Sequence, residues 1–253
     1  MSRPTALVTG ASDRVGRAIA IELARSGFDL VLHHRNSQQK LSETAEACAQ
    51  LGAGVHQVRA DLAEPDQVEA LADATQAAFG ALSLLVNNAS LFSPDPFEAI
   101  TAESWARMLQ VNLTAPFRLS QALLPALRAA DPAWVGGPEG QGALVVHLCD
   151  IGSERPLVGY TPYSVSKAGL SMLMRSMAIE LAPEVRCVTL SPGQVAWPPT
   201  YSQEKRAKLA QRIPMGRCGT PEDVARLVRF LTLEGHYLNG IDIPVDGGLA
   251  ARY

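Results

Sequence analysis

Short apolar segments alternate along the chain with longer segments in which apolar residues recur at helical spacing. Residues 5–9, Thr-Ala-Leu-Val-Thr, predict a β-strand, and residues 17–25 carry the apolar period of an α-helix. The same alternation continues to the end of the chain and predicts one α/β domain over residues 1–253, a Rossmann-type doubly wound sheet of mostly parallel strands with helices on both faces. Further strands are predicted over residues 29–33, 82–86 and 143–148. Another strand, third in chain order, is predicted to end with residues 58–62.

The first strand and the first helix are joined by a glycine turn, residues 10–16, Gly-Ala-Ser-Asp-Arg-Val-Gly. A helix amino terminus offers free N–H groups and the positive end of the helix dipole, which favour a diphosphate. Gly10 lets the backbone approach that diphosphate, and Gly16 lets the helix approach the strand. With Arg14 and Val15, these glycines predict the binding site of a dinucleotide cofactor.

The second strand is followed by His34, Arg35, Asn36 and Ser37 rather than by an acidic residue. An acid at this place would hold the ribose 2′-hydroxyl of NAD, whereas arginine and serine favour a 2′-phosphate. Arg14 adds a second cation on the same side, so we expect NADPH as the cofactor. The alternative is that both arginines are solvated loop cations.

Small and amide side chains follow the third and fourth strands. Asp61 and Leu62 end the third strand, and Asp61 is placed to accept the adenine amino group. Asn88, Ala89 and Ser90 follow the fourth strand, and such residues suit a crevice where a cofactor lies against the backbone. An ordinary turn is the alternative interpretation of the asparagines.

Tyr163 and Lys167 form a Y-x-x-x-K pair, with Asp150 thirteen residues before the tyrosine. A phenol with a pKa of about 10 is a poor proton donor at neutral pH. A lysine ammonium one helical turn away favours the phenolate, so we expect Lys167 to lower the pKa of Tyr163 toward the working range. Short matches of this kind also arise by chance, and the ordered set of motifs around this one favours a catalytic role.

Composition excludes several other classes. A chain of 253 residues that is 47% hydrophobic buries a large core, and a net charge of −3 without a basic stripe argues against nucleic-acid binding. The start of the chain lacks a signal-peptide apolar core and the long helical segments carry charges, so we expect a cytoplasmic protein that does not enter the membrane. The four cysteines and five histidines show no metal-ligand spacing, and no metal is expected.

The chain resembles the short-chain dehydrogenase/reductase family from about residue 5 to residue 248. The resemblance implies a seven-stranded parallel sheet and a homotetramer. It also implies that Lys167 binds the nicotinamide ribose and that Asn112 positions this lysine through water. The family's motifs stand in the expected order: the glycine turn, Asp61-Leu62, Asn87-Asn88-Ala89, Asn112, Tyr163, Lys167, Ser191-Pro192-Gly193 and Val245-Asp246-Gly247-Gly248.

Two departures from the general family pattern are shared with its pteridine reductases. Arg14 replaces the middle glycine of the turn, and Asp150 replaces the catalytic serine. This closer similarity implies that Ser90 hydrogen-bonds a pterin and that Phe92 stacks on it, opposite the nicotinamide. The basic residue in the segment 34–37 stands in a slightly different register from that group, so the individual phosphate contacts are left open.

An aspartate beside the proton-donating tyrosine points to a C=N substrate. A carbonyl reductase needs a hydrogen-bond donor for an oxygen that becomes alkoxide-like, and a carboxylate repels that oxygen. A pterin ring nitrogen instead gains a proton as hydride arrives at carbon, so cationic iminium character develops, and the carboxylate of Asp150 stabilises it. The sequence therefore predicts an NADPH-dependent pteridine reductase that acts on a dihydropterin or dihydrofolate.

Two other functions are compatible with the sequence, and one loop is expected to contact the substrate. The first rival is a 3-oxoacyl thioester reductase or another carbonyl reductase of the same family, and the second is a cofactor-binding regulator without chemistry. Pro192 and Gly193 are expected to touch the cofactor where the family's variable substrate loop begins. Residues 196–201 and a helix over 203–212 are expected to cover the substrate, with Trp197 near it or packed as an anchor.

Overall fold

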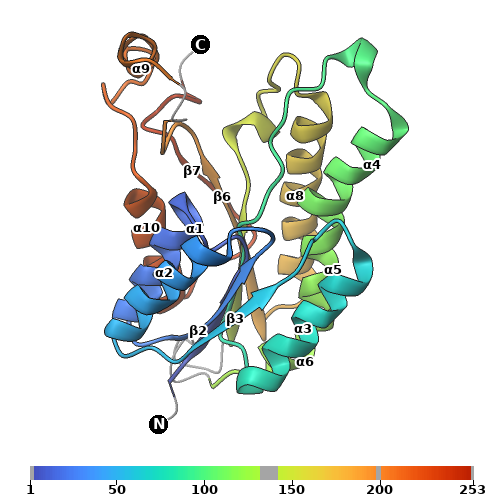
Figure 1. Cartoon of the computed structure of the whole chain (residues 1–253), viewed down its shortest axis with the longest axis vertical. Coiled ribbons are helices and arrows are strands. Elements are labelled where there is room, and N and C mark those ends of the chain that lie inside the picture. Colours follow the sequence, from blue (N-terminus) through green and yellow to red (C-terminus); the bar gives the residue numbers. More distant parts are fainter. Residues whose placement is uncertain (1–2, 132–141, 198–200, 252–253) are drawn as a thin grey trace.

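The computed structural model describes residues 3–131, 142–197 and 201–251. Its centre is a seven-stranded sheet in the order β3-β2-β1-β4-β5-β6-β7, in which every neighbouring pair is parallel (Figure 1). This confirms the predicted doubly wound sheet. The strands are β1 (Thr5–Val8), β2 (Asp29–His34), β3 (Val55–Arg59), β4 (Leu84–Asn87), β5 (Ala143–Leu148), β6 (Val185–Pro192) and β7 (Asp242–Val245).

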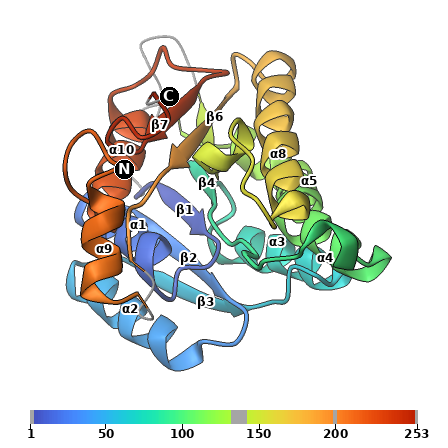
Figure 2. The ribbon, with the colours of Figure 1, turned by 90° about the horizontal axis from the view of Figure 1, so that it is seen from above.

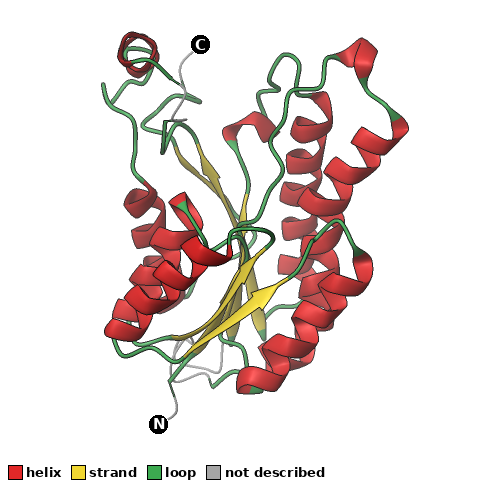
Figure 3. Cartoon of the chain, viewed as in Figure 1, coloured by secondary structure: helices red, strands yellow, loops and turns green. Residues whose placement is uncertain are grey.

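Helices cover both faces of the sheet, as the views from the side and from above show (Figures 1 and 2). One face carries α1 (Arg14–Arg25), α2 (Gln38–Gln50) and α10 (Pro221–Leu233). The other carries α3 (Pro65–Phe79), α4 (Ala102–Leu109), α5 (Ala115–Ala122), α6 (Leu124–Arg128) and α8 (Thr161–Glu180). The short helix α9 (Gln203–Ala210) lies beyond the carboxyl ends of the strands, above the layers. Colouring by secondary structure makes the three layers visible (Figure 3).

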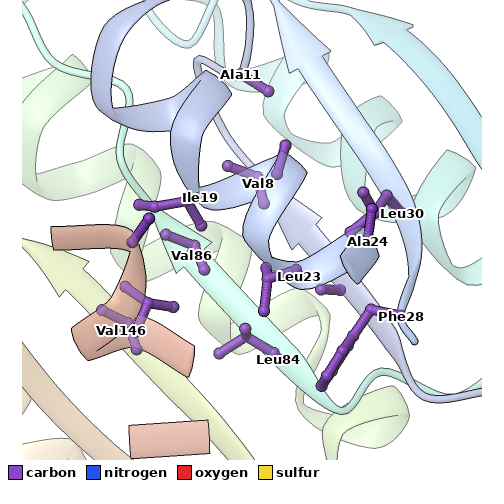
Figure 4. Close-up of a cluster of buried hydrophobic side chains, with 14 of the residues drawn as sticks. Val8, Ala11, Ile19, Leu23, Ala24, Phe28, Leu30, Leu84, Val86 and Val146 are labelled. Atoms are coloured by element: carbon purple, nitrogen blue, oxygen red, sulfur yellow. The ribbon is translucent and has the colours of Figure 1, made fainter. Parts of the chain in front are cut away.

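The central strands are apolar on both faces because both are covered. Every residue of β1, β4 and β5 is buried, which is typical of parallel strands between two helical layers. Figure 4 shows one of the two resulting cores, in which Ile19 and Leu23 of α1 meet Val86 of β4. At about 25 cal/mol per Å² of apolar surface removed from water, this double coverage is the main stabilising contribution.

Several boundaries differ from the sequence prediction. Helix α1 begins at Arg14 rather than at residue 17, because the side chain of Asp13 caps it by accepting the N–H of Arg14 at 2.8 Å. Strand β3 ends at Arg59, so Asp61 and Leu62 follow the strand instead of ending it. Helix α9 is two residues shorter than expected. The glycine- and proline-rich run over residues 130–142 also predicts a loop, and it lies mostly outside the described residues.

Strand order reverses between β1 and β4, and this reversal positions the site. The connections from β1 and β4 leave toward opposite faces, so a crevice opens at their carboxyl ends. The glycine turn follows β1, and the Asn88 segment follows β4. The sheet topology therefore brings together the two segments that sequence analysis assigned to the cofactor.

Candidate active site

A cavity of about 600 Å³ lies at the carboxyl ends of the strands. Two predicted site residues do not line it, namely Asn112 and Trp197. The lining brings together the other predicted residues: Gly10, Arg14, Val15, Gly16, His34, Arg35, Asn36, Ser37, Asp61, Leu62, Asn88, Ala89, Ser90, Phe92, Asp150, Tyr163, Lys167, Pro192 and Gly193. It also includes Tyr201 of the expected substrate cover, together with residues that sequence analysis did not assign to the site, among them Asp13, His33, Leu148, Cys149 and Val195.

The glycine turn packs backbone against backbone. A Cβ atom on Gly16 would lie 2.2 Å from the carbonyl oxygen of Gly10, so only glycine fits there. Asn88 joins this turn to β4, because its Nδ2 donates to the carbonyl oxygens of Thr9 at 2.8 Å and Gly10 at 3.1 Å. The asparagine therefore shapes the cofactor crevice from the side of β4.

Arg14 occupies a backbone conformation that favours glycine. Its φ is +49°, in the left-handed region that costs an ordinary residue about 1–2 kcal/mol. Its guanidinium donates to the carbonyl oxygen of Ala196 at 3.2 Å, across the mouth of the cavity. The backbone conformation thus explains why the family has a glycine at this position. The arginine side chain connects the glycine turn with the predicted substrate loop.

His33 supports the glycine turn from beneath. Its Nδ1 accepts the N–H of Gly10 at 3.1 Å, and its Nε2 lies 3.0 Å from the carbonyl oxygen of Ala60. One ring nitrogen accepts and the other donates, so the imidazole is neutral. Sequence analysis missed this role, although a polar side chain in a strand buried on both faces needs hydrogen-bond partners.

The buried His33 predicts acid sensitivity of the fold. Burial lowers its pKa from 6.5 to about 4, so the unfolded chain binds the proton more tightly than the folded one. The contribution of His33 to the free energy of unfolding is therefore fully present above pH 6.5 and is lost as the pH falls toward 4. From this group alone, we expect a loss of about 2 kcal/mol between pH 7 and pH 5. Urea unfolding at both pH values checks it, and His33→Gln should reduce the pH-dependent loss. An equal loss in that variant would contradict the assignment.

Tyr163 and Asp150 form a hydrogen-bonded pair inside the cavity. The phenol of Tyr163, on α8, donates to Oδ2 of Asp150 at 2.9 Å. Asp150 follows β5, and its Oδ1 accepts the N–H of Gly152 at 2.6 Å, which fixes the carboxylate. Desolvation, followed by the charge of Asp150, raises the pKa of Tyr163 well above its ordinary value. The phenol therefore stays protonated.

The expected effect of Lys167 on Tyr163 is wrong. The Nζ of Lys167 lies 5.8 Å from the centre of the tyrosine ring and donates to the carbonyl oxygen of Leu148 at 2.7 Å. Burial lowers the pKa of Lys167, which weakens its ability to favour a phenolate. The carboxylate of Asp150 is in direct contact with the phenol, so it outweighs the more distant ammonium.

Asn112 organises the active site from behind. It lies in a π-helical turn, Gln110–Thr114, that follows α4. Its Oδ1 accepts the N–H of Leu91 at 2.8 Å, and its Nδ2 donates to Oγ of Ser166 on α8 at 3.1 Å. The side chain thus fastens the loop after β4 to the helix of Tyr163. Its expected action on Lys167 through water stays a prediction.

An aromatic cluster marks the substrate side. The ring of Phe92 stacks on Tyr160 at 4.7 Å and meets the edge of Tyr163 at 4.8 Å. Phe92 remains 59% exposed, so part of this ring is available to a flat ligand. The hydroxyl of Ser90 donates to the side chain of Asn112 at 3.2 Å, and its predicted contact with a substrate is not tested.

The predicted substrate cover is described only in part. Residues 198–200 lie outside the described residues, and Trp197 lies beside Tyr201 with ring centres 6.4 Å apart. Tyr201, rather than Trp197, lines the cavity. The tryptophan ring therefore lies beside the residue that lines the cavity, and its contact with a substrate stays a prediction.

The residues present fit a nicotinamide dinucleotide. The backbone contact between Gly10 and Gly16 leaves the amino terminus of α1 open to a diphosphate, and Lys167 lines the same cavity near Tyr163. Among the described residues, no group of histidine, cysteine and acidic side chains is arranged to hold a metal ion. In the same part of the chain, no helix has the length and apolar character needed to cross a membrane.

Fold and site together define a Rossmann-type oxidoreductase. The chain matches the family described as "Enoyl-(Acyl carrier protein) reductase" over residues 10–250. It belongs to the short-chain dehydrogenase/reductase family, whose members use nicotinamide cofactors.

Relatives with different printed activities share this similarity. The chain is 34% identical to L-rhamnose 1-dehydrogenase (NAD(P)(+)) from Azotobacter vinelandii, over 97% of this chain and 96% of the relative. It is 32% identical to a 3-oxoacyl-(acyl-carrier-protein) reductase FabG from Aggregatibacter actinomycetemcomitans, over 97% and 98%. A crystal structure of a putative short-chain alcohol dehydrogenase from Sinorhizobium meliloti 1021 has a TM-score of 0.89 at 27% identity, covering 100% of this chain and 98% of that one. None of these three descriptions mentions a pterin.

Proposed function

We propose that the protein is an NADPH-dependent pteridine reductase that adds hydride and a proton across a C=N bond of a dihydropterin or dihydrofolate. The observation that carries this proposal is the carboxylate of Asp150, fixed by Gly152 and in contact with the phenol of Tyr163 inside the cavity. Bound NADPH supplies the hydride. Gly10, Asn88 and Lys167 would hold the cofactor, with the glycine turn against its diphosphate.

The chain's own residues supply the proton and the charge stabilisation. Hydride adds to the ring carbon, and the electron pair of the C=N bond moves to the adjacent nitrogen, which takes a proton. Protonation of that nitrogen before or during the transfer gives it iminium character, and the carboxylate of Asp150 stabilises this cationic form. The proton comes from the hydrogen-bonded pair of Tyr163 and Asp150. The new C–H bond takes the hydride, the new N–H bond takes the proton, and the C=N double bond becomes single.

The aromatic cluster supports a flat substrate. One face of Phe92 is covered by Tyr160, and the ring as a whole stays largely exposed. Stacking of a heteroaromatic ring on such a side chain contributes about 0.5–1.5 kcal/mol beyond area burial. A pterin held against Phe92 would lie near the proton-donating pair, because Phe92 also touches Tyr163.

A carbonyl reductase is the second candidate function. Two observations favour it: a protonated Tyr163 can donate to a carbonyl oxygen, and the relatives reported above include a 3-oxoacyl reductase. The carboxylate of Asp150 opposes it, because an oxygen that becomes negative would lie beside a negative group.

Steady-state assays separate the two functions. The panel contains dihydrobiopterin, dihydrofolate and their oxidised forms, together with an acetoacetyl thioester and a simple ketone, each with NADPH and NADH. We expect turnover of the dihydro compounds with NADPH and a kcat/KM at least about 100-fold lower for the carbonyl compounds. Rapid ketone reduction without any pteridine turnover would exclude the proposed function. Tight cofactor binding with no turnover at all would instead support a regulator.

A further inference from the structure

The adenosine end of the cavity contains a carboxylate that opposes a phosphate ligand. Asp13 lines the cavity next to Arg14, and the segment that begins at His34 and ends at Ser37 lines the same cavity. This carboxylate also has a structural task, because its Oδ1 accepts the N–H of Arg14 and so caps α1. A fixed negative charge here would repel a phosphate that carries a charge of about −2.

A lysine from another helix balances this carboxylate. Nζ of Lys40 lies 2.6 Å from Oδ2 of Asp13, so the two carboxylate oxygens have separate partners. Lys40 belongs to the first turn of α2, three residues after Ser37, which lines the cavity. The Lys40 ammonium lowers the pKa of the Asp13 carboxyl, which therefore remains charged together with its partner.

Stability gives little reason for the ion pair. Both side chains are more than half exposed, 59% for Lys40 and 55% for Asp13, and exposed ion pairs contribute little to folding. The ion pair has a larger effect on the affinity for a charged ligand in the adjoining cavity. With Lys40 in place the charge of Asp13 is neutralised, and without Lys40 the ligand meets an uncompensated carboxylate. Arg14 and Arg35 remain as cations of the same pocket.

We propose that Lys40 is a specificity-determining residue that neutralises Asp13, so that Arg14 and Arg35 can bind the 2′-phosphate of the cofactor. This inference rests on the proposed use of NADPH and adds the reason why a carboxylate is tolerated in its phosphate pocket. The pair lets one aspartate cap α1 without excluding the phosphorylated cofactor.

Binding measurements on the whole protein test this role. Isothermal titration with NADPH, NADH and 2′,5′-ADP gives dissociation constants for the wild type, Lys40→Gln, Asp13→Asn and the double variant. Lys40→Gln should weaken NADPH and 2′,5′-ADP by on the order of tenfold, because one unit of charge is lost beside a dianion, and change NADH less than about twofold. Asp13→Asn keeps a good cap and should bind NADPH at least as tightly as the wild type.

The double variant and a matched control distinguish neutralisation from other effects. Asp13→Asn in the Lys40→Gln background should restore NADPH binding to within about threefold of the wild type, because no carboxylate is left to balance. Arg128→Gln removes the cation of an exposed pair with Glu184, neither of which lines the cavity, and should leave the NADPH to NADH ratio unchanged.

Each contrary result has its own meaning. A wild type that prefers NADPH, with an unchanged ratio in Lys40→Gln, overturns the role of Lys40 and leaves the proposed cofactor intact. Weakened NADPH binding that the double variant does not restore overturns the neutralising role. A wild type that binds both cofactors equally overturns the proposed cofactor preference and this inference together.

Discussion

Replacing Asp150 by serine is expected to lower kcat for a dihydropterin by at least about 100-fold, the scale of one lost electrostatic or proton-transfer contribution. The carboxylate that stabilises the cationic nitrogen disappears, whereas the serine hydroxyl can still accept the N–H of Gly152. The same variant should gain activity on an acetoacetyl thioester, because the hydroxyl can donate to a carbonyl oxygen. Steady-state kinetics on both substrates measures the two changes.

A second substitution separates charge from shape at the same position. Asp150→Asn keeps the size of the side chain and an acceptor for Gly152 but carries no charge. It should lose pterin turnover as severely as the serine variant, with NADPH binding within about twofold of the wild type. Pterin turnover that survives both changes would remove the basis of the proposed function.

The fold followed from the sequence because its periodicity is strong. Residues 143–148 were predicted as a strand with the bounds that the structure gives β5, since a continuous apolar run has one favourable place, the centre of a covered parallel sheet. The start of α1 was missed by three residues. The cap by Asp13 depends on a side-chain hydrogen bond that apolar spacing does not encode.

The residues of the candidate site could be predicted from the ordered motifs in the sequence. The pKa shifts and ion pairs of the site could not. Spacing correctly placed Tyr163 and Lys167 on one helix, but the direction of the lysine depends on the carbonyl oxygen of Leu148, which β5 contributes. The sign of the pKa change of Tyr163 depends on burial and on the contact with Asp150, which are results of tertiary packing. For the same reason, the pairing of Asp13 with Lys40 could not be predicted, because it depends on how α1 and α2 pack beside each other in the fold.

Tyr163→Phe is expected to lower kcat by on the order of 1000-fold, because it removes the protonated hydroxyl at the reacting end of the cavity. The phenylalanine keeps the ring contact with Phe92, so substrate KM should change less than about threefold. Circular dichroism and the dissociation constant of NADPH serve as controls for folding and cofactor binding.

The pH dependence of the wild type tests the same group differently. Because burial and Asp150 raise the pKa of Tyr163, its deprotonation should produce no loss of kcat up to pH 9. A loss centred near pH 7 that Tyr163→Phe abolishes would show that the tyrosine ionises in the working range, and would contradict the structure.

The Asp150→Ser, Tyr163→Phe double variant tests whether the pair acts as one unit. Asp150 stabilises the cationic nitrogen that the proton from Tyr163 creates, so the two losses are not additive, and the double variant should be no slower than Tyr163→Phe alone. Additive losses would mean that Asp150 and Tyr163 contribute separately. The hydrogen bond between them would then be a ground-state contact that the reaction does not use.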